Sequence, residues 1–129
     1  MRLLLDTHIL LWALDTPARL DGRTRALLED PANEVLFSAA SIWEIAIKAR
    51  LGRADFPVRP DQIAQAARDT GFTELPVCAD AAARVADLPL HHRDPFDRLL
   101  VAQAMAEPMR LYTVDPLLPP YSELVTLIG

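Results

Sequence analysis

The sequence predicts a single α/β domain, residues 1–129, built on a central, mostly parallel sheet with helices on both sides. Apolar runs without polar alternation recur along the chain, which is typical of parallel strands covered on both faces. Segments with helical spacing separate these runs, and alternating strands and helices favour a parallel sheet. The length of 129 residues and a composition of 51% hydrophobic and 24% charged residues are those of one globular domain.

The first half of the chain supplies two strand–helix pairs. A buried strand over residues 3–5 ends at Asp6, and a second strand over 34–37 ends just before Ser38. The Asp30-Pro31 pair closes one helix, because proline disfavours a helical conformation in the residue before it. Gly52 closes another as a C-terminal stop. The helices predicted here cover residues 7–14, 23–29 and 39–51, with a loop over 17–21.

In the second half, turn residues mark the boundaries more sharply than hydrophobic spacing does. Asp61 is expected to cap a helix that Gly71 ends, and Asp94-Pro95 starts another, because a short acid caps and proline fits the first turn. The helices predicted here cover residues 61–70, 80–88 and 95 to about 107; the strands cover 73–75, 110–114 and 124–128; the loops cover 56–60 and 117–121.

Four acids occupy a repeated kind of position. Asp6 and Asp115 follow strands, and Glu44 and Asp97 lie in the first turns of helices. The carboxyl ends of parallel strands and the starts of the following helices share one edge of the sheet, where ligands gather. We therefore expect these four carboxylates to meet there.

Each acid also has a purely structural interpretation. Asp6 is placed to cap the helix after it, and Asp115-Pro116 is placed to start a turn. Ser41 and Glu44 match the capping-box spacing, although a helix that begins nearer Ser38 leaves Glu44 past the capping position. Asp94 is interpreted as a cap and not as a ligand.

A cluster of carboxylates calls for a cation. Two like charges about 4 Å apart repel by about 4 kcal/mol at an effective dielectric of 20, and the repulsion raises carboxyl pKa values. Hard oxygen ligands suit Mg²⁺ or Mn²⁺. Such a site activates water and stabilises the leaving oxygen of a phosphodiester, so hydrolysis needs no serine, cysteine or histidine nucleophile.

Other chemistries are poorly supported. The chain has four glycines, no glycine-rich phosphate loop and no G-x-S-x-G elbow. Its single cysteine, Cys78, forms no internal disulfide, and no Cys/His group has zinc spacing. The net charge of −5 argues against a generally basic nucleic-acid binder. Residues 1–14 lack a signal-peptide pattern and no apolar run approaches 20 residues, which predicts a cytoplasmic protein.

Four motifs carry a family resemblance. They are LLLDTHILLWAL at residues 3–14, SAASIWEIAIK at 38–48, HHRDPFDRLLVAQA at 91–104 and LYTVDPLLPPY at 111–121. In order, spacing and domain length the chain resembles the PIN-domain family, specifically the VapC-type toxins of bacterial toxin–antitoxin pairs.

The resemblance implies a three-layer fold with an acidic Mg²⁺ or Mn²⁺ site and metal-dependent ribonuclease activity. It also implies a cognate antitoxin as partner and a homodimer. By position, Asp6, Glu44 and Asp97 match the core acidic residues of the family, and Asp115 matches the fourth. The proline-rich stretch 116–120 departs from the family pattern, which makes Asp115 the least firmly assigned of the four.

Further residues near the motifs have two interpretations each. Thr7 and Thr113 align with polar positions that flank the acids. Cations beside the motifs are placed either for substrate phosphates or on a solvated face; they are Lys48, Arg50, Arg53, Arg93 and Arg98. The three histidines are interpreted as polar surface or hydrogen-bonding residues, not ligands; they are His8, His91 and His92. Trp12 and Trp43 are core residues or apolar surface for the antitoxin.

The sequence leaves two alternative classes of function to consider. A catalytically silent PIN-like module would bind RNA or protein without cutting, although the presence of all four acids disfavours it. A phospho-receiver domain needs a lysine after a late strand, and Lys48, the only lysine, lies on the helix of Glu44. If RNA is the substrate, unpaired RNA is expected, because a cleavable strand must enter the pocket.

Overall fold

A computed structural model describes residues 1–52 and 59–128, and it has the predicted α/β architecture. Its sheet contains five strands in the order β3-β2-β1-β4-β5, and every neighbouring pair is parallel. The strands are β1 (Arg2–Leu5), β2 (Glu34–Ser38), β3 (Thr73–Leu75), β4 (Arg110–Thr113) and β5 (Val125–Leu127). The central strand β1 pairs Leu4 with Leu36 of β2 and with Leu111 of β4.

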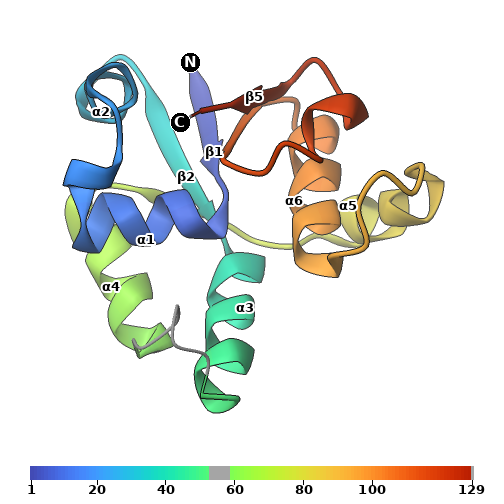
Figure 1. The fold of residues 1–129 in the computed structure, drawn as a ribbon, viewed down its shortest axis with the longest axis horizontal. Helices are drawn as coiled ribbons and strands as arrows, with labels where there is room; N and C mark the ends of the chain where they lie inside the picture. The colour runs from blue at the N-terminus through green and yellow to red at the C-terminus, as the bar shows by residue number, and fades with distance from the viewer. Residues whose placement is uncertain (53–58, 129) are drawn as a thin grey trace.

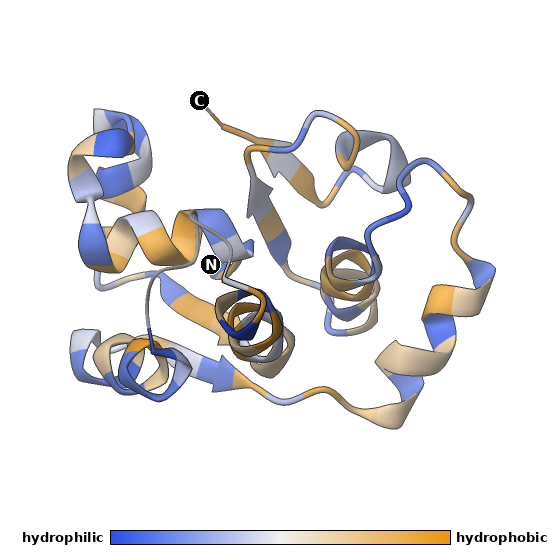
Figure 2. Ribbon diagram, turned by 60° about the horizontal axis from the view of Figure 1, so that its bottom comes forward, coloured by the Kyte–Doolittle hydropathy of each residue, from blue (hydrophilic) through white to orange (hydrophobic). Residues whose placement is uncertain are grey.

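Within the described residues, six α-helices cover the sheet. They are α1 (Thr7–Asp15), α2 (Gly22–Glu29), α3 (Ala39–Arg50), α4 (Pro60–Thr70), α5 (Ala79–Arg84) and α6 (Pro95–Ala106). In Figure 1, α1, α2 and α4 lie on one side of the strands, and α5 and α6 lie on the other. In Figure 2 the helices carry both hydrophilic and hydrophobic bands, as amphipathic helices that cover a sheet do.

The two faces of β1 enter two separate cores. Leu3 and Leu5 pack with Ile9 of α1 and Ile45 of α3, whereas Leu4 packs with Leu100 of α6 on the opposite face. Alternate side chains of a strand point to opposite faces of the sheet, and here both faces are covered. This explains why residues 3–5 form an apolar run without polar alternation.

Helix starts follow the predicted capping chemistry with one exception. Asp6, Asp21 and Asp94 cap α1, α2 and α6 through side-chain hydrogen bonds. The prediction that Asp61 caps a helix was wrong, because α4 begins at Pro60 and its N-cap is Arg59, without a side-chain bond. Proline has the φ angle of a first helical turn, so the helix starts one residue earlier and places Asp61 within it.

Smaller boundaries also differ from the prediction. The helix expected over 80–88 is α5 followed by a 3₁₀ turn, η2 (Val85–Asp87). The predicted loops 17–21 and 117–121 contain two further 3₁₀ turns, η1 (Pro17–Arg19) and η3 (Pro119–Tyr121). Part of the predicted loop 56–60 lies outside the described residues. No helix in the described ranges is long and apolar enough to cross a membrane.

Candidate active site

Asp6 lies directly after β1 and is both a cap and a site residue. Its Oδ1 accepts from the backbone N–H of Ile9 at 2.8 Å, which starts α1. Its Oδ2 accepts from Thr113 Oγ1 at 2.7 Å and from the backbone N–H of Val114 at 3.1 Å, both at the end of β4. Burial raises the pKa of Asp6, while these hydrogen bonds act in the opposite direction.

Glu44 lies inside α3 and not in a capping box. Ser38 is the N-cap of this helix and accepts from the backbone N–H of Ala40, so Glu44 lies in the second turn. Its carboxylate is buried and accepts from Thr7 Oγ1 at 2.6 Å and from Lys48 Nζ at 2.5 Å. Because Thr7 follows Asp6 in the chain, Glu44 is tied to the end of β1.

Asp97 lies in the first turn of α6, where Asp94 caps the helix. Asp94 Oδ1 accepts from the backbone N–H groups of Phe96 at 2.8 Å and Asp97 at 3.1 Å. The pKa of Asp97 is raised to about 7, first by burial and then by the charges of Asp94, Glu44 and Asp6. Glu44 and Asp6, the other two predicted core acids, both contribute to this rise in the pKa of Asp97.

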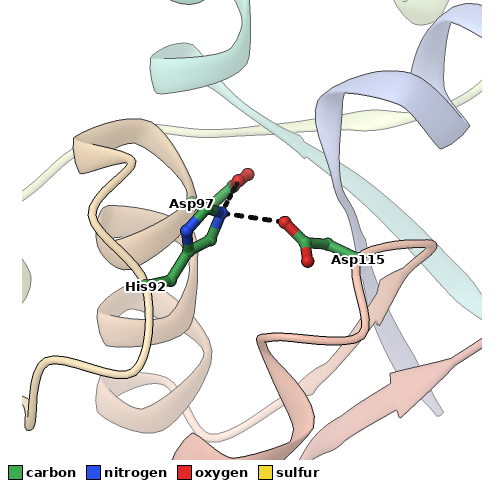
Figure 3. Close-up of side chains that lie close together, drawn as sticks. All are labelled: His92, Asp97 and Asp115. Atoms are coloured by element: carbon green, nitrogen blue, oxygen red, sulfur yellow. Dashed lines mark hydrogen bonds and ion pairs between the residues drawn. The ribbon is translucent and has the colours of Figure 1, made fainter.

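Asp115 joins the cluster through His92, a residue that was interpreted as a hydrogen-bonding side chain. His92 Nε2 lies 3.1 Å from Asp97 Oδ2 and 2.8 Å from Asp115 Oδ2 (Figure 3). The hydrogen-bonding interpretation is confirmed, but its place between two predicted site residues was missed. The one available signal was its position five residues before Asp97 within the same motif.

The proline-rich stretch 116–120 does not carry Asp115 away from the other acids. Asp115 N–H donates to Thr113 Oγ1 at 3.0 Å, the same hydroxyl that donates to Asp6. Asp115 Oδ1 accepts from the backbone N–H of Leu117 at 2.9 Å, so it also starts the turn that its sequence suggests. Thr7 and Thr113, the two flanking polar residues, thus each hold one of the acids.

The side chains gathered here would suit a divalent cation. Within the described residues, the group with cation-binding spacing is His92, Asp97 and Asp115, whose ligand atoms all lie within 4.8 Å of one another. Asp6 and Glu44 act on Asp97 electrostatically from the adjoining elements. Buried carboxylate oxygens that repel one another fit a hard cation such as Mg²⁺ or Mn²⁺.

Comparison with known proteins agrees with this architecture. A family model described as the PIN domain matches residues 3–119. The chain belongs to the PIN-domain family. It is 33% identical over 116 residues to the ribonuclease VapC22 of Mycobacterium tuberculosis strain H37Rv, covering 87% of this chain and 85% of that relative. A shorter match of 36 residues, 56% identical, relates it to ribonuclease VapC16 of the same organism and covers 28% of this chain and 26% of that protein.

Solved structures resemble this PIN domain over its whole length. The structure of VapBC2 from Rickettsia felis bound to a DNA fragment from their promoter matches with a TM-score of 0.70 and 14% identity, covering 100% of both chains. The structure of FitAcB from Neisseria gonorrhoeae matches with a TM-score of 0.53 and 19% identity, covering 98% of this chain and 96% of that one. At such identities the matches concern the fold.

The cations around the site of this PIN domain have different partners. Arg98 donates to the carbonyls of Val85, Leu88 and Pro89 at 3.0–3.3 Å, so it supports a loop and does not lie on a solvated face. Lys48 pairs with Glu44. Arg50 and Arg93 are exposed, and Arg53 lies outside the described residues.

The two tryptophans also differ. Trp43 is 59% exposed, so its core interpretation was wrong, and its ring packs edge-on against Phe96 with 5.2 Å between ring centroids. Trp12 is half-buried, with the Arg19 guanidinium 4.7 Å from its ring centroid. Helix α3 buries Glu44 and Ile45 while presenting the preceding residue, Trp43, to the outside.

Proposed function

We propose that this PIN domain is a metal-dependent endoribonuclease, a VapC-type toxin that hydrolyses RNA phosphodiester bonds and is neutralised by a cognate antitoxin. The observation that carries the proposal is the meeting of acidic side chains from the ends of β1 and β4 and from α3 and α6, linked by Thr7, Thr113 and His92. The chain is also homologous, over 87% of its length, to a protein named a ribonuclease. A carboxyl pKa near 7 is the mark of a crowded, buried acid cluster, and perturbed pKa values are typical of functional sites.

The residues proposed to hold Mg²⁺ or Mn²⁺ are Asp6, Glu44, Asp97 and Asp115. When bound, the cation activates water and stabilises the charge that develops on the phosphate. The protein's own contribution is orientation. Thr113 and Val114 N–H fix Asp6, and Thr7 and Lys48 fix Glu44. Without a cation, Asp97 holds a proton up to about pH 7.

The test is cleavage of a single-stranded RNA by the purified chain in Mg²⁺, in Mn²⁺ and in EDTA. Asp97→Asn is expected to lower cleavage by at least 100-fold, because it removes a charged cation ligand. Asp80→Asn is the matched control, since Asp80 is an exposed acid in the first turn of α5, as Asp97 is in α6. Cleavage that EDTA leaves undiminished, or that survives in Asp97→Asn, contradicts the proposal.

The same assay separates the catalytically silent alternative. A silent module binds RNA or protein without any metal-dependent cleavage, and neither Asp97→Asn nor EDTA then changes the RNA. The structure does not support a phospho-receiver domain, because Lys48 lies on α3 and pairs with the site acid Glu44.

For the antitoxin we propose the apolar surface formed by Trp43 and Phe96. Large aromatic side chains are enriched at protein–protein interfaces, and Trp43 is 59% exposed. Trp43→Ala is expected to weaken the complex with the proposed cognate antitoxin by at least tenfold in Kd, measured by calorimetry. Leu127→Ala, an exposed side chain on β5, is the control. Unchanged affinity in Trp43→Ala contradicts the assignment, and weakened RNA binding instead assigns the surface to substrate.

The homodimer stays a prediction that light scattering of the purified chain tests. A molar mass near 14.3 kDa would show a monomer and a value of twice that mass would show a dimer.

A further inference from the structure

His92 occupies the space between two of the proposed metal ligands. It lies in the loop between η2 and α6, its side chain is 18% exposed, and its ring points at Asp97 and Asp115 (Figure 3). Nε2 is the atom that faces both carboxylates, meeting Oδ2 of each at 3.1 and 2.8 Å. The ring contacts only Oδ2 of each acid, and Oδ1 of Asp115 accepts from the backbone N–H of Leu117.

The opposite ring nitrogen decides which atom carries the proton. Nδ1 accepts from the backbone N–H of Arg93 at 3.0 Å. A neutral imidazole has one N–H and one acceptor nitrogen, so its proton is on Nε2 and points at the carboxylates. If Nε2 bound a cation, the proton of the neutral ring would have to be on Nδ1. It would then point at the backbone N–H of Arg93, which is also a donor. Histidines that bind metals normally donate from the second nitrogen to an acceptor, and here that nitrogen faces a donor.

The backbone of His92 is held by distant parts of the chain. The Tyr121 hydroxyl at the end of η3 accepts from the backbone N–H groups of His92 at 2.8 Å and His91 at 3.0 Å. Arg98 Nη1 donates to the carbonyl of His92 at 3.4 Å and to that of Pro89 at 3.0 Å. The backbone of the loop that carries His92 is therefore anchored by Tyr121 and Arg98.

We propose that His92 is a positioning residue of the metal centre: its Nε2–H holds the Asp97 and Asp115 carboxylates side by side, and it does not itself bind the cation. The inference rests on the proposed function, since it concerns the same site. Without the N–H between them, two carboxylates at this spacing repel and separate. A cation then has to reassemble the pair, which lowers its affinity.

The experiment measures Mn²⁺ binding by electron paramagnetic resonance at pH 8, where Asp97 is ionised, and without RNA. Residues that orient metal ligands typically contribute about 10–100-fold to metal affinity, and His92→Ala is expected to weaken Mn²⁺ binding by that factor. His92→Gln places an amide N–H near the position of Nε2–H and is expected to recover most of the affinity. His91→Ala is the matched control, because the His91 ring packs on Tyr121 at 4.8 Å between centroids.

A second measurement separates positioning from ligation. Pulsed spectra of Mn²⁺ bound to the wild-type chain are expected to lack the coupling of a directly bonded ¹⁴N nucleus. If that coupling is present and disappears in His92→Gln, His92 is a ligand and the inference is overturned. Mn²⁺ affinity in His92→Ala equal to that of the wild type overturns it as well.

Two further outcomes keep the test decisive. If His92→Ala does not fold by circular dichroism, His92→Asn replaces it, because its shorter amide falls short of both acids and is expected to show the same loss. A wild-type chain that binds no Mn²⁺ overturns both the inference and the metal-dependent function. Wild-type binding with an unaffected His92→Ala removes the inference alone.

Discussion

The raised pKa of Asp97 makes the stability of the folded chain depend on pH. Its pKa rises from 3.8 to about 7, so in the absence of metal the folded state binds a proton that the unfolded chain has released. Between about pH 4 and pH 7 the folded state therefore holds more protons, and the free energy of unfolding falls as the pH rises. This is the opposite of the usual behaviour of a salt-bridged carboxylate.

Asp97→Asn is expected to remove most of this pH dependence and to raise the free energy of unfolding at pH 8 by about 1–3 kcal/mol. The measurement is urea denaturation in EDTA at pH 5 and pH 8. Asp80→Asn is expected to keep the wild-type dependence. A smaller slope persists in Asp97→Asn, because burial also raises the pKa of Asp6. An unchanged slope would show that Asp97 is ionised throughout.

Asp6 should respond to amide substitution in the opposite way. Both of its oxygens accept backbone N–H groups, from Ile9 and Val114. An asparagine at this position places an N–H group against one of these donors, whichever way the amide is turned. Asp6→Asn is expected to cost about 1–3 kcal/mol of stability, measured by urea denaturation at pH 8. Stability equal to that of the wild type would show that neither hydrogen bond contributes.

At the level of elements, Ser38 connects the start of α3 to α6. Its Oγ accepts from Ala40 N–H and donates at 2.6 Å to Oε1 of the buried Gln103, whose amide reaches the Pro76 carbonyl after β3. Ser38→Ala removes a helix cap and leaves a buried acceptor, so a loss of about 2–3 kcal/mol is expected. The measurement is thermal unfolding of both variants. Ser122→Ala removes one hydrogen bond within a local turn and is expected to lower the stability by less than Ser38→Ala does. Equal losses would contradict this role.

The elements also show why some of the structure could be predicted and some could not. Asp94 and Pro95 start α6 as expected, because capping depends on neighbouring residues. Helix α4 starts at Pro60, one residue before the predicted start, because proline and the neighbouring acid Asp61 are competing signals for a helix start. His92 could not be placed beside Asp115, because its position depends on Tyr121, 29 residues away. Capping is local and loop placement is tertiary.

For the whole molecule, the parallel sheet explains why scattered acids were predictable as a group. All five strands run in one direction, so the ends of β1, β2 and β4 lie at the same edge, together with the helix starts. This rule predicts the positions of Asp6, Glu44 and Asp115, and the predicted start of α6 gives the position of Asp97. The exposure of Trp43 could not be predicted in this way, because it depends on which elements pack against the outer side of α3.

The gathered charges make the stability of the whole domain depend on metal. A cation that binds only the folded state stabilises it by about 2.7 kcal/mol when its concentration is 100 times its Kd. The midpoint of thermal unfolding is therefore expected to rise by several degrees in Mg²⁺ or Mn²⁺ relative to EDTA, and more at pH 8 than at pH 5, where a proton occupies Asp97. Asp97→Asn is expected to show little of this rise. A wild-type midpoint indifferent to both cations would mean that the four carboxylates share no metal.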